Sequence, residues 1–190
     1  MKYVKMLGLL AVAAAALMAF AGAASATEVT SETGSTPNIH ATSIDTELHG
    51  EAFSVGCDHS TVEGNLETHS ATGTAKGEID VLTFTGCDYP VTVKAKGSLE
   101  VHKDTKVGAE TGDGILTSSG AVITIHGPFG INCEYETNNT EVGTLTGGHD
   151  AIIHVDTSAI PRVRDSAFCG NFGEWTGTYT VTHPTTLEVH

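Results

Sequence analysis

Acidic and histidine side chains recur at alternating positions in two segments of this sequence, and their types could hold a metal ion. In the segment HDAIIHVD, Asp150, His154 and Asp156 share one face of an extended chain, because successive side chains of a β-strand point to opposite faces. In GINCEYE, Glu134 and Glu136 share a face in the same way. If the two strands were neighbours, imidazole and carboxylate groups would converge on one patch, where they could bind zinc or copper. These five residues are therefore the candidate metal ligands.

A simpler interpretation competes with the metal site. The same residues are what wet, outward-facing strand surfaces carry, and the remaining histidines are scattered through turns and termini. We therefore expect no cofactor, with a divalent cation as the alternative. Calcium would also need backbone carbonyls in a tight loop, and the segment ETGDGI (residues 110–115) is the candidate loop.

Signatures of common catalytic sites are absent from the sequence. It contains no Gly-x-Ser-x-Gly elbow, no His-Glu-x-x-His motif, no Ser-x-x-Lys motif and no glycine-rich phosphate loop. Glycoside hydrolases, however, need only two carboxylates without a local motif, and the chain has 23 Asp and Glu residues. No catalytic residue is predicted, and a carbohydrate-active hydrolase with paired carboxylates stays open.

The chain begins with the three parts of an export signal. Lys2 and Lys5 give a positive start, residues 7–23 are an unbroken apolar run, and Ala24-Ser25-Ala26 is a small-x-small cleavage site. Residues 1–26 are therefore predicted to be a Sec-type signal peptide cleaved after Ala26, which places the protein outside the cell or in the cell envelope.

The remainder divides into a short leader and one domain. Residues 27–39 are rich in Thr, Ser and Glu and are predicted to be a flexible leader, and residues 40–190 form a single β domain. With 9 Lys and Arg against 23 Asp and Glu, the formal net charge is −14. So acidic a chain repels polyanions, which excludes nucleic acid and anionic lipid surfaces as partners. Extracellular or cell-envelope components remain as partners, with no membrane span after signal removal.

Four cysteines in an exported chain of this size indicate a disulfide set. Three pairings are possible. We favour Cys57–Cys87 and Cys133–Cys169, which cross-link one half of the domain each. A zinc site is disfavoured because the sequence has no closely spaced Cys-x-x-Cys pair.

Short runs of Thr, Val and Ile broken by Gly, Asn and Asp, without helical spacing, predict an all-β protein. In VTVKAKGSLEVH (91–102) apolar and polar residues alternate, so it is one half-buried strand or two segments bent at Gly97. EIDVLTFTGC (78–87) is apolar on both faces and is therefore central or carries a β-bulge. About ten to twelve short strands are expected, as in a single-domain antiparallel β-sandwich or barrel.

The last residues, 169–190, have the cleanest strand pattern. Trp175, Gly177, Tyr179 and Val181 point one way and threonines point the other. Because large aromatic side chains bury the most area, Trp175 and Tyr179 are predicted to seal one end of the core.

Four features together resemble the small exported β-rich proteins common in high-GC actinobacteria. They are the alanine-rich signal peptide, the run LTFTGC after a first cysteine, the segment INCEYE, and the terminal FCGN…WTGTYTVTHPTTLEV. The similarity spans most of residues 50–190. That group has no assigned activity, so the resemblance implies fold and export, and no functional residue is carried over from it.

These observations favour a non-enzymatic exported protein with a structural or binding role. The first alternative is a β-barrel that holds a small ligand, which would need a closed barrel with an apolar interior. The second is the carbohydrate-active hydrolase, which would need a cleft with two facing carboxylates.

Overall fold

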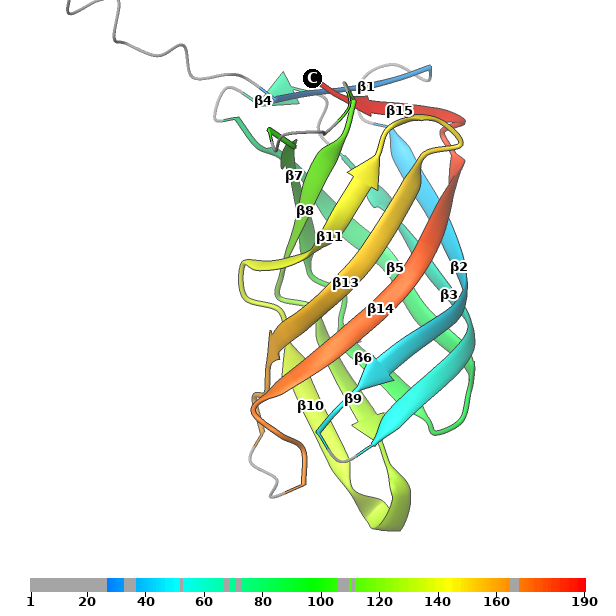
Figure 1. Ribbon diagram of the computed structural model, residues 1–190, viewed down its shortest axis with the longest axis vertical. Coiled ribbons are helices and arrows are strands. Elements are labelled where there is room, and N and C mark those ends of the chain that lie inside the picture. Colours follow the sequence, from blue (N-terminus) through cyan, green and yellow to red (C-terminus); the bar gives the residue numbers. More distant parts are fainter. Residues whose placement is uncertain are drawn as a thin grey trace, which may run out of the picture.

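The computed structural model describes residues 27–32, 37–51, 53–66, 69–70, 73–105, 110, 112–164 and 168–190. The predicted signal peptide lies outside the described residues, as does part of the predicted leader. The described chain is a closed barrel of eight antiparallel strands with a small sheet at each end (Figure 1). The predicted all-β class is confirmed, and of the two architectures considered the barrel is the one formed.

Eight strands close the barrel through antiparallel pairs between neighbours, and the last strand pairs with the first. Around the barrel they are β11 (Thr140–Thr146), β13 (Ile152–Pro161), β14 (Phe172–His183), β2 (Asn38–His49), β3 (Ser54–Asn65), β5 (Ala75–Cys87), β7 (Ser98–Lys103) and β8 (Gly114–Ser119). A closed barrel leaves no unpaired sheet edge, and it encloses an interior lumen.

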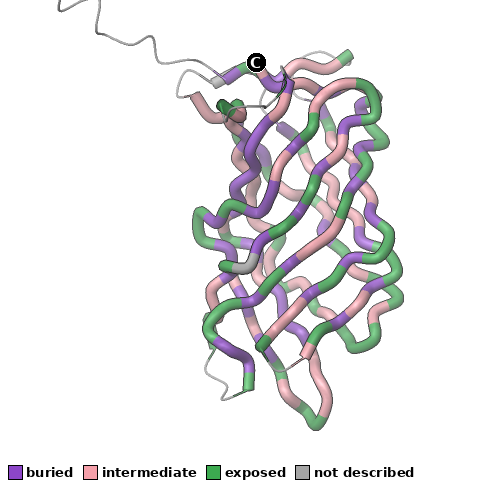
Figure 2. Tube along the Cα trace, viewed as in Figure 1, coloured by how far each residue is buried: buried purple, intermediate pink, exposed green. Residues whose placement is uncertain are grey.

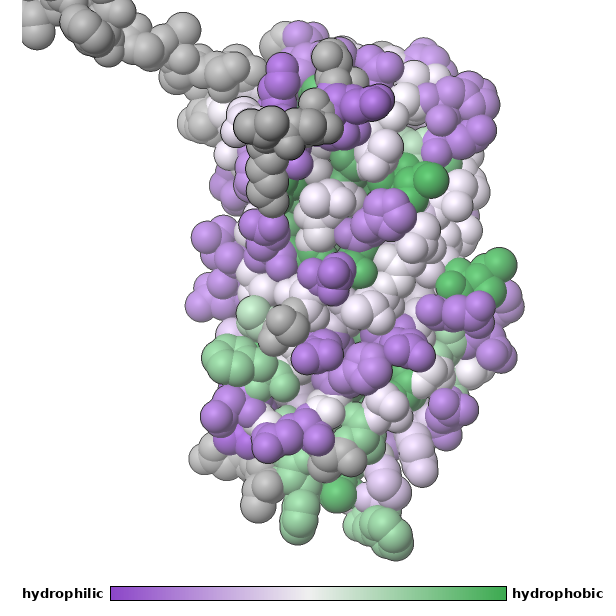
Figure 3. Space-filling view, in the orientation of Figure 1, coloured by the Kyte–Doolittle hydropathy of each residue, from purple (hydrophilic) through white to green (hydrophobic). Residues whose placement is uncertain are grey.

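Buried and exposed residues alternate along the barrel strands (Figure 2). On β14, Trp175, Tyr179 and Val181 are buried, and on β13 Ile153 and Val155 are buried, as the alternation predicted. Hydrophilic side chains cover much of the visible outer side of the barrel (Figure 3). Apolar side chains are therefore turned into the lumen, and they form the core there.

A four-stranded sheet, here called the cap sheet, covers the end of the barrel where the chain ends (Figure 1). Its strands, in order, are β12 (Gly148–His149), β15 (Thr186–Val189), β1 (Thr27–Ser31) and β4 (His69–Ser70). Val29, Leu187 and Val189 are buried beneath it, 0–2% exposed. The cap sheet thus closes one mouth of the lumen with apolar side chains.

The prediction of a flexible leader over residues 27–39 does not describe its two ends. Thr27–Ser31 form β1, which pairs with β15, and β2 begins at Asn38. The low apolar content of this segment is misleading, because the main chain supplies many of its interactions and a few residues, Thr27, Val29 and Pro37, are buried. Glu32 follows β1, and its carboxylate accepts hydrogen bonds from the backbone N–H groups of Thr185 and Thr186.

A three-stranded sheet, here called the base sheet, extends the opposite end of the barrel (Figure 1). Its strands, in order, are β10 (Asn132–Glu136), β9 (Val122–His126) and β6 (Val91–Ala95), and the turn between β9 and β10 contains a short 3₁₀ segment, η1 (Pro128–Gly130). The predicted strand 91–102 is therefore two strands bent at Gly97, where φ is 71°. The first segment, β6, belongs to the base sheet and the second, β7, to the barrel.

Two irregular pairs change which side chains face the lumen. The pairing of β5 with β3 skips Asp80, so Ile79 and Leu82 both line the lumen, although a regular strand would place them on opposite faces. This confirms the bulge predicted in that apolar run. In β2, Asp45 adopts a φ of 59°, and Ser43 and Thr46 on either side of the irregularity are both buried.

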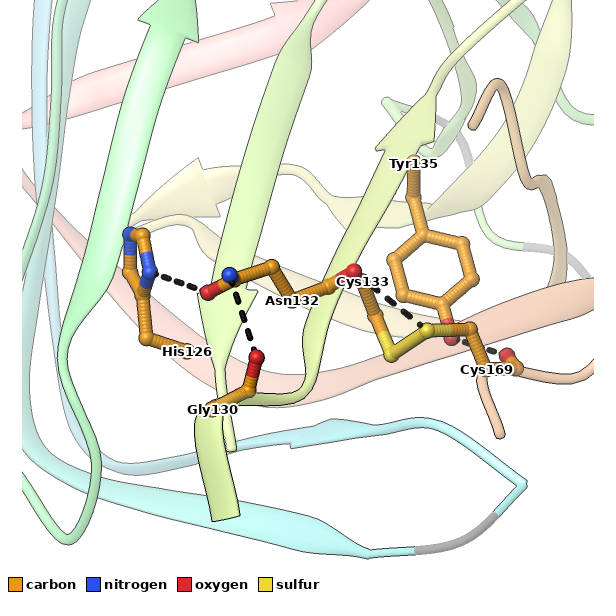
Figure 4. The surroundings of a disulfide bond; sticks show 6 residues. All are labelled: His126, Gly130, Asn132, Cys133, Tyr135 and Cys169. Carbon is orange, nitrogen blue, oxygen red and sulfur yellow. Dashed lines mark hydrogen bonds between the residues drawn. A yellow bond between two sulfur atoms is a disulfide. The ribbon is translucent and has the colours of Figure 1, made fainter. Parts of the chain in front are cut away.

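Both predicted disulfides, Cys57–Cys87 and Cys133–Cys169, are formed. The first joins facing residues of β3 and β5. The second joins β10 to the segment just before β14, and the Tyr135 hydroxyl donates a hydrogen bond to the backbone oxygen of Cys169 (Figure 4). The base of the molecule is therefore cross-linked covalently.

Candidate ligand-binding cavity

The lumen contains two adjoining cavities with an almost wholly apolar lining. Their volumes are about 50 Å³ and about 30 Å³. Five side chains line both cavities and so lie at the boundary between them: Val62, Ile79, Leu99, Leu116 and Ile153. Five strands, β3, β5, β7, β8 and β13, supply these side chains, and Ile79 lies beside the β5 bulge, so the site depends on the barrel register.

The larger cavity lies beneath the cap sheet. Leu187 of β15 lines it from the cap side, and Ile39 and Leu66 line it from the adjacent ends of β2 and β3. Leu187 is 2% exposed. A ligand that entered from this end would therefore have to displace β15 or pass beside it.

Aromatic side chains close the deeper cavity. Trp175 and Tyr179 line it, and their ring centroids lie 6.1 Å apart in an edge-to-face arrangement. Phe84 of β5 meets Trp175 at 5.7 Å in a similar arrangement. Trp175 lies near the start of β14, on the base side of the lumen, so these rings seal the lumen below the cavities, as the sequence predicted.

Polar groups are concentrated on one wall of the lumen, formed by β14, β2 and β3. The Tyr179 hydroxyl donates to Ser60 Oγ at 2.8 Å, and the Ser60 hydroxyl donates to the backbone oxygen of Thr83 at 2.9 Å. Burial raises the pKa of Tyr179, and the polar groups of Ser60, Thr46 and Trp175 oppose that rise. Tyr179 is therefore a neutral hydrogen-bonding group at physiological pH.

Two buried donors on this wall, Thr46 Oγ1 and Trp175 Nε1, lie near the Tyr179 hydroxyl and lower its pKa, but neither makes a hydrogen bond of regular geometry with a described residue. Thr46 is 0% exposed and Trp175 is 7% exposed. An unpartnered buried polar group costs about 1–3 kcal/mol, so such groups in native proteins need an explanation. We refer to these two groups as the donor pair.

The candidate metal ligands are not brought together. β10, which carries Glu134 and Glu136, pairs with β9, whereas β13, which carries His154 and Asp156, pairs with β11 and β14. β10 meets the chain only just after the end of β13, through a bridge between Tyr135 and Arg162, so Glu134 and Glu136 do not face His154 and Asp156 across a strand pair. Asp150, in the turn before β13, lies 2.8 Å from His149.

Each of the better-placed candidates is already engaged. Glu134 Oε2 bonds to the Lys94 ammonium and lies 3.9 Å from Arg164, and the Lys94 hydrogen bond lowers the pKa of Glu134. His154 Nδ1 lies 3.3 Å from Thr178 Oγ1. Within the described ranges, no group of three or more His, Cys, Asp or Glu side chains could hold a metal ion.

The candidate calcium loop is only partly described, since Thr111 lies outside the described residues. The carboxylate of Asp113 accepts hydrogen bonds from the backbone N–H groups of Gly147 (3.1 Å) and Glu110 (3.0 Å). This carboxylate therefore holds the connection between β11 and β12 to the segment just before the start of β8.

An open polar groove of about 550 Å³ lies on the outer surface beside the ends of β2 and β14. Glu51, Glu174 and His49 line it together with Phe172. His49 faces Glu174 across the strand pair, and its Nε2 lies 2.9 Å from Glu47. Glu51 and Glu174 thus supply two carboxylates to one open groove, which is the kind of place the hydrolase alternative would need.

The sequence reasoning did not find Thr46, Ser60 or Val62 as lumen residues. Regular alternation fails at the β2 irregularity, because Ser43 and Thr46 are both buried. A pair of small hydroxyl residues on either side of an Ile-Asp dipeptide in an otherwise alternating strand is the signal that could have located it.

No helix in the described part of the chain is long and apolar enough to cross a membrane. The two disulfides are consistent with an extracellular protein. No protein-family model, curated protein or solved structure matches the chain.

Proposed function

We propose that this chain is an exported, non-enzymatic binding protein whose barrel lumen holds a small, mainly apolar molecule. The single observation that carries the proposal is the pair of adjoining apolar cavities inside a closed barrel. Small closed barrels hold ligands in this position, enclosed by inward-facing side chains. A purely structural barrel would gain stability by filling the same space, since voids cost packing energy.

The cavity volumes define the size of the ligand. A water molecule needs roughly 10–15 Å³ of such space, and drug-sized ligands occupy pockets of about 300–1,000 Å³. The two cavities, at about 50 and 30 Å³, lie between these limits. Water is a poor occupant because the lining offers it almost no polar partners. The proposed ligand therefore has few non-hydrogen atoms.

The cap end is the proposed route of entry. The larger cavity lies there, and the cap sheet is attached by main-chain pairing and by Glu32. Both disulfides lie toward the base: Cys57 faces Cys87, the last residue of β5, and Cys133 of the base-sheet strand β10 joins Cys169. Opening the cap breaks hydrogen bonds and exposes the buried side chains of Val29, Leu187 and Val189, but breaks no covalent link, whereas opening the base would strain the disulfides.

Export by the predicted signal peptide belongs to the same proposal. β1 begins at Thr27, the residue that cleavage after Ala26 would make the mature N-terminus. The acidic charge directs the protein away from polyanionic partners and toward extracellular or cell-envelope components. Mass spectrometry of the exported protein should give a chain that starts at Thr27, and a chain recovered with Met1 would contradict export by cleavage.

The binding proposal is tested by titrating the protein with xenon and with benzene and following methyl resonances of Leu116 and Ile153, which line both cavities. Saturable shifts at these methyl groups are expected. Ala121→Leu, which fills the deeper cavity, should suppress them there, whereas Ile44→Ala, at a site that is 70% exposed, should leave them unchanged. The absence of saturable shifts with both probes would refute the proposal.

A cavity-enlarging variant provides a second measurement. Leu116→Ala should merge the two cavities at a cost of about 2–5 kcal/mol in unfolding free energy. Benzene should then bind this variant more tightly than it binds the unaltered protein, and its melting temperature should rise with the logarithm of ligand concentration once the site is near saturation.

A further inference from the structure

The two lumen cavities lie one after the other along the barrel strands, and this order bears on the shape of the ligand in the proposed function. On β7, Val101 lines only the larger cavity, and Leu99, two residues away, lines both. On β13, Ile153 lines both cavities and Val155 lines only the deeper one. Leu145, which lines only the larger cavity, faces Ile153 across the β11–β13 pair, so the layers agree between strands. The enclosed space is therefore elongated along the strands, by roughly 7 Å for each two-residue step.

The boundary between the cavities consists of aliphatic side chains alone. Two of its five members, Leu99 and Leu116, are not branched at Cβ and so change rotamer more readily than the valine and the two isoleucines beside them. A chain one methylene wide can pass between such side chains after small movements. A molecule with a branched, compact carbon skeleton would have to stay on one side of the boundary.

Both ends of the elongated space are closed, and its lining offers a ligand almost no polar partner. Leu187, which is 2% exposed, covers it at the cap, and Trp175 and Tyr179 close it toward the base. The Tyr179 hydroxyl is directed to Ser60, to which it donates a hydrogen bond of 2.8 Å. A polar atom of a ligand in this space would lose its hydration without a replacement hydrogen bond.

The two volumes set the length of the ligand. At roughly 10–15 Å³ for each group the size of a water molecule or a methylene, cavities of about 50 and 30 Å³ together hold roughly five to eight such groups. The larger cavity alone holds roughly three to five. A ligand therefore needs both cavities to reach the upper end of this range.

We propose that the ligand is an unbranched hydrocarbon chain of about five to eight carbons, which runs through both cavities along the strands and is wholly enclosed. This inference rests on the proposed function and specifies its ligand class. A straight chain removes apolar surface from water in both cavities. A compact isomer would fill one cavity and leave the side chains around the other without contacts.

The test compares n-hexane with 2,2-dimethylbutane, two isomers that differ in shape and contain the same atoms. The exported chain is used with both disulfides intact, and the methyl resonances of Val101 and Val155 report on the larger and the deeper cavity separately. Hexane should shift both sets of resonances with one dissociation constant, whereas 2,2-dimethylbutane should shift one set. Hexane should bind about tenfold more tightly, because about two more of its carbons are enclosed. Hexan-1-ol should bind at least about tenfold more weakly than hexane, since its hydroxyl would be buried without a partner.

Two variants should change the preferred chain length in opposite directions, measured by titration with the straight-chain alkanes from propane to octane. Ala121→Leu fills part of the deeper cavity and should shorten the best-bound chain by about three carbons. Leu145→Ala enlarges the larger cavity and should lengthen it by about three carbons. The matched control is Ile44→Ala, at a site that is 70% exposed, and it should leave the preferred length unchanged. If the leucine at position 121 prevents folding, the Leu145 variant still tests the length prediction.

Three results would overturn the inference and leave the proposed function standing, provided that xenon or benzene binds in the lumen. They are equal affinities for the two hexane isomers, an affinity for hexan-1-ol as high as that for hexane, and a preferred chain length that neither cavity variant changes. If xenon, benzene and the alkanes all fail to bind the unaltered protein, the proposed function fails and this inference fails with it.

Discussion

The link between Cys133 and Cys169 is expected to contribute a large share of the stability of the base, and replacing both cysteines by serine measures it. The two residues are 36 positions apart in the sequence. For a closed loop of that length, the chain-entropy model gives about 4 kcal/mol of destabilisation when the bond is removed. Since small domains have unfolding free energies of about 5–15 kcal/mol, the variant should unfold at a much lower denaturant concentration.

The disulfide also positions a hydrogen bond, and this gives the experiment a second readout. The Tyr135 hydroxyl, buried in the base, donates to the backbone oxygen of Cys169 (Figure 4). Tyr135→Phe should cost about 1 kcal/mol while the disulfide holds residue 169 in place. Without the disulfide this segment is free to move, so the same substitution should cost less. The effects of the two changes should therefore be smaller together than the sum of each alone.

Unfolding in guanidinium chloride, followed by far-ultraviolet circular dichroism and by Trp175 emission, provides the measurement. The matched control replaces Cys57 and Cys87 by serine, because their separation of 30 residues predicts a nearly equal entropic cost. That control should also alter Trp175 emission in the folded state, since Phe84, which contacts Trp175 at 5.7 Å, lies just before Cys87. The Cys133/Cys169 variant should change this emission less, because its cysteines have no such ring contact with Trp175.

The reasoning would be refuted in either of two ways. The cost for the Cys133/Cys169 variant could be below about 1 kcal/mol. That would mean either that residual strand pairing already restricts this loop in the unfolded chain, or that the native state relaxes once the bond is removed. Full additivity of the Tyr135→Phe effect would mean that residue 169 keeps its place without the disulfide.

Two further predictions concern the cap and the bend at Gly97. The pKa of Glu32 is lowered from 4.5 to about 2, chiefly by the hydrogen bond from the Thr185 hydroxyl. The contribution of Glu32 to cap stability should therefore be present above pH 4.5 and be lost as the pH falls toward 2. Hydrogen exchange at the Thr185 and Thr186 amides should accelerate over that interval relative to neighbouring amides, and Glu32→Gln should abolish this pH dependence; unchanged exchange would contradict it. Gly97→Ala should cost more than about 2 kcal/mol in unfolding free energy, because φ is 71° and the new Cβ would lie 2.4 Å from backbone atoms of Ser119 and Ala121. Gly130→Ala, at φ 77° with nothing within 4 Å of the new Cβ, should cost only the conformational strain, about 1 kcal/mol, and equal costs at the two glycines would refute the steric argument.

The sequence predicted the features that depend on local alternation and on cysteine count. β13 and β14 bury the side chains that a period of two assigned to the core, and Cys133 and Cys169 form the expected link. The strand at 91–102 bends at Gly97 because only glycine adopts that backbone conformation without strain. These are consequences of a few neighbouring residues, so a single sequence was enough to find them.

The lumen could not be predicted in the same way, because its composition depends on which strands become neighbours. Ile79 and Leu82 both face inward only because β5 bulges against β3. Thr46 and Trp175 come from strands far apart in the sequence, and their juxtaposition follows from the pairing of β14 with β2. The metal-site hypothesis depended on the same unknown, namely which strands become neighbours. Alternation placed His154 and Glu134 on strand faces correctly, but nothing in either segment specified the neighbouring strand.

The two ends of the barrel are closed by different kinds of interaction, and this asymmetry connects stability with the proposed function. At the base, two disulfides and the Trp175, Tyr179 and Phe84 rings hold the wall that carries the donor pair. At the cap, β1 and β15 pair through the main chain and Leu187 covers the larger cavity. Regions held by few covalent constraints open at lower free energy than a cross-linked core. Under the proposed function, the cross-linked base can therefore stay closed while the cap opens, which would let a small ligand exchange.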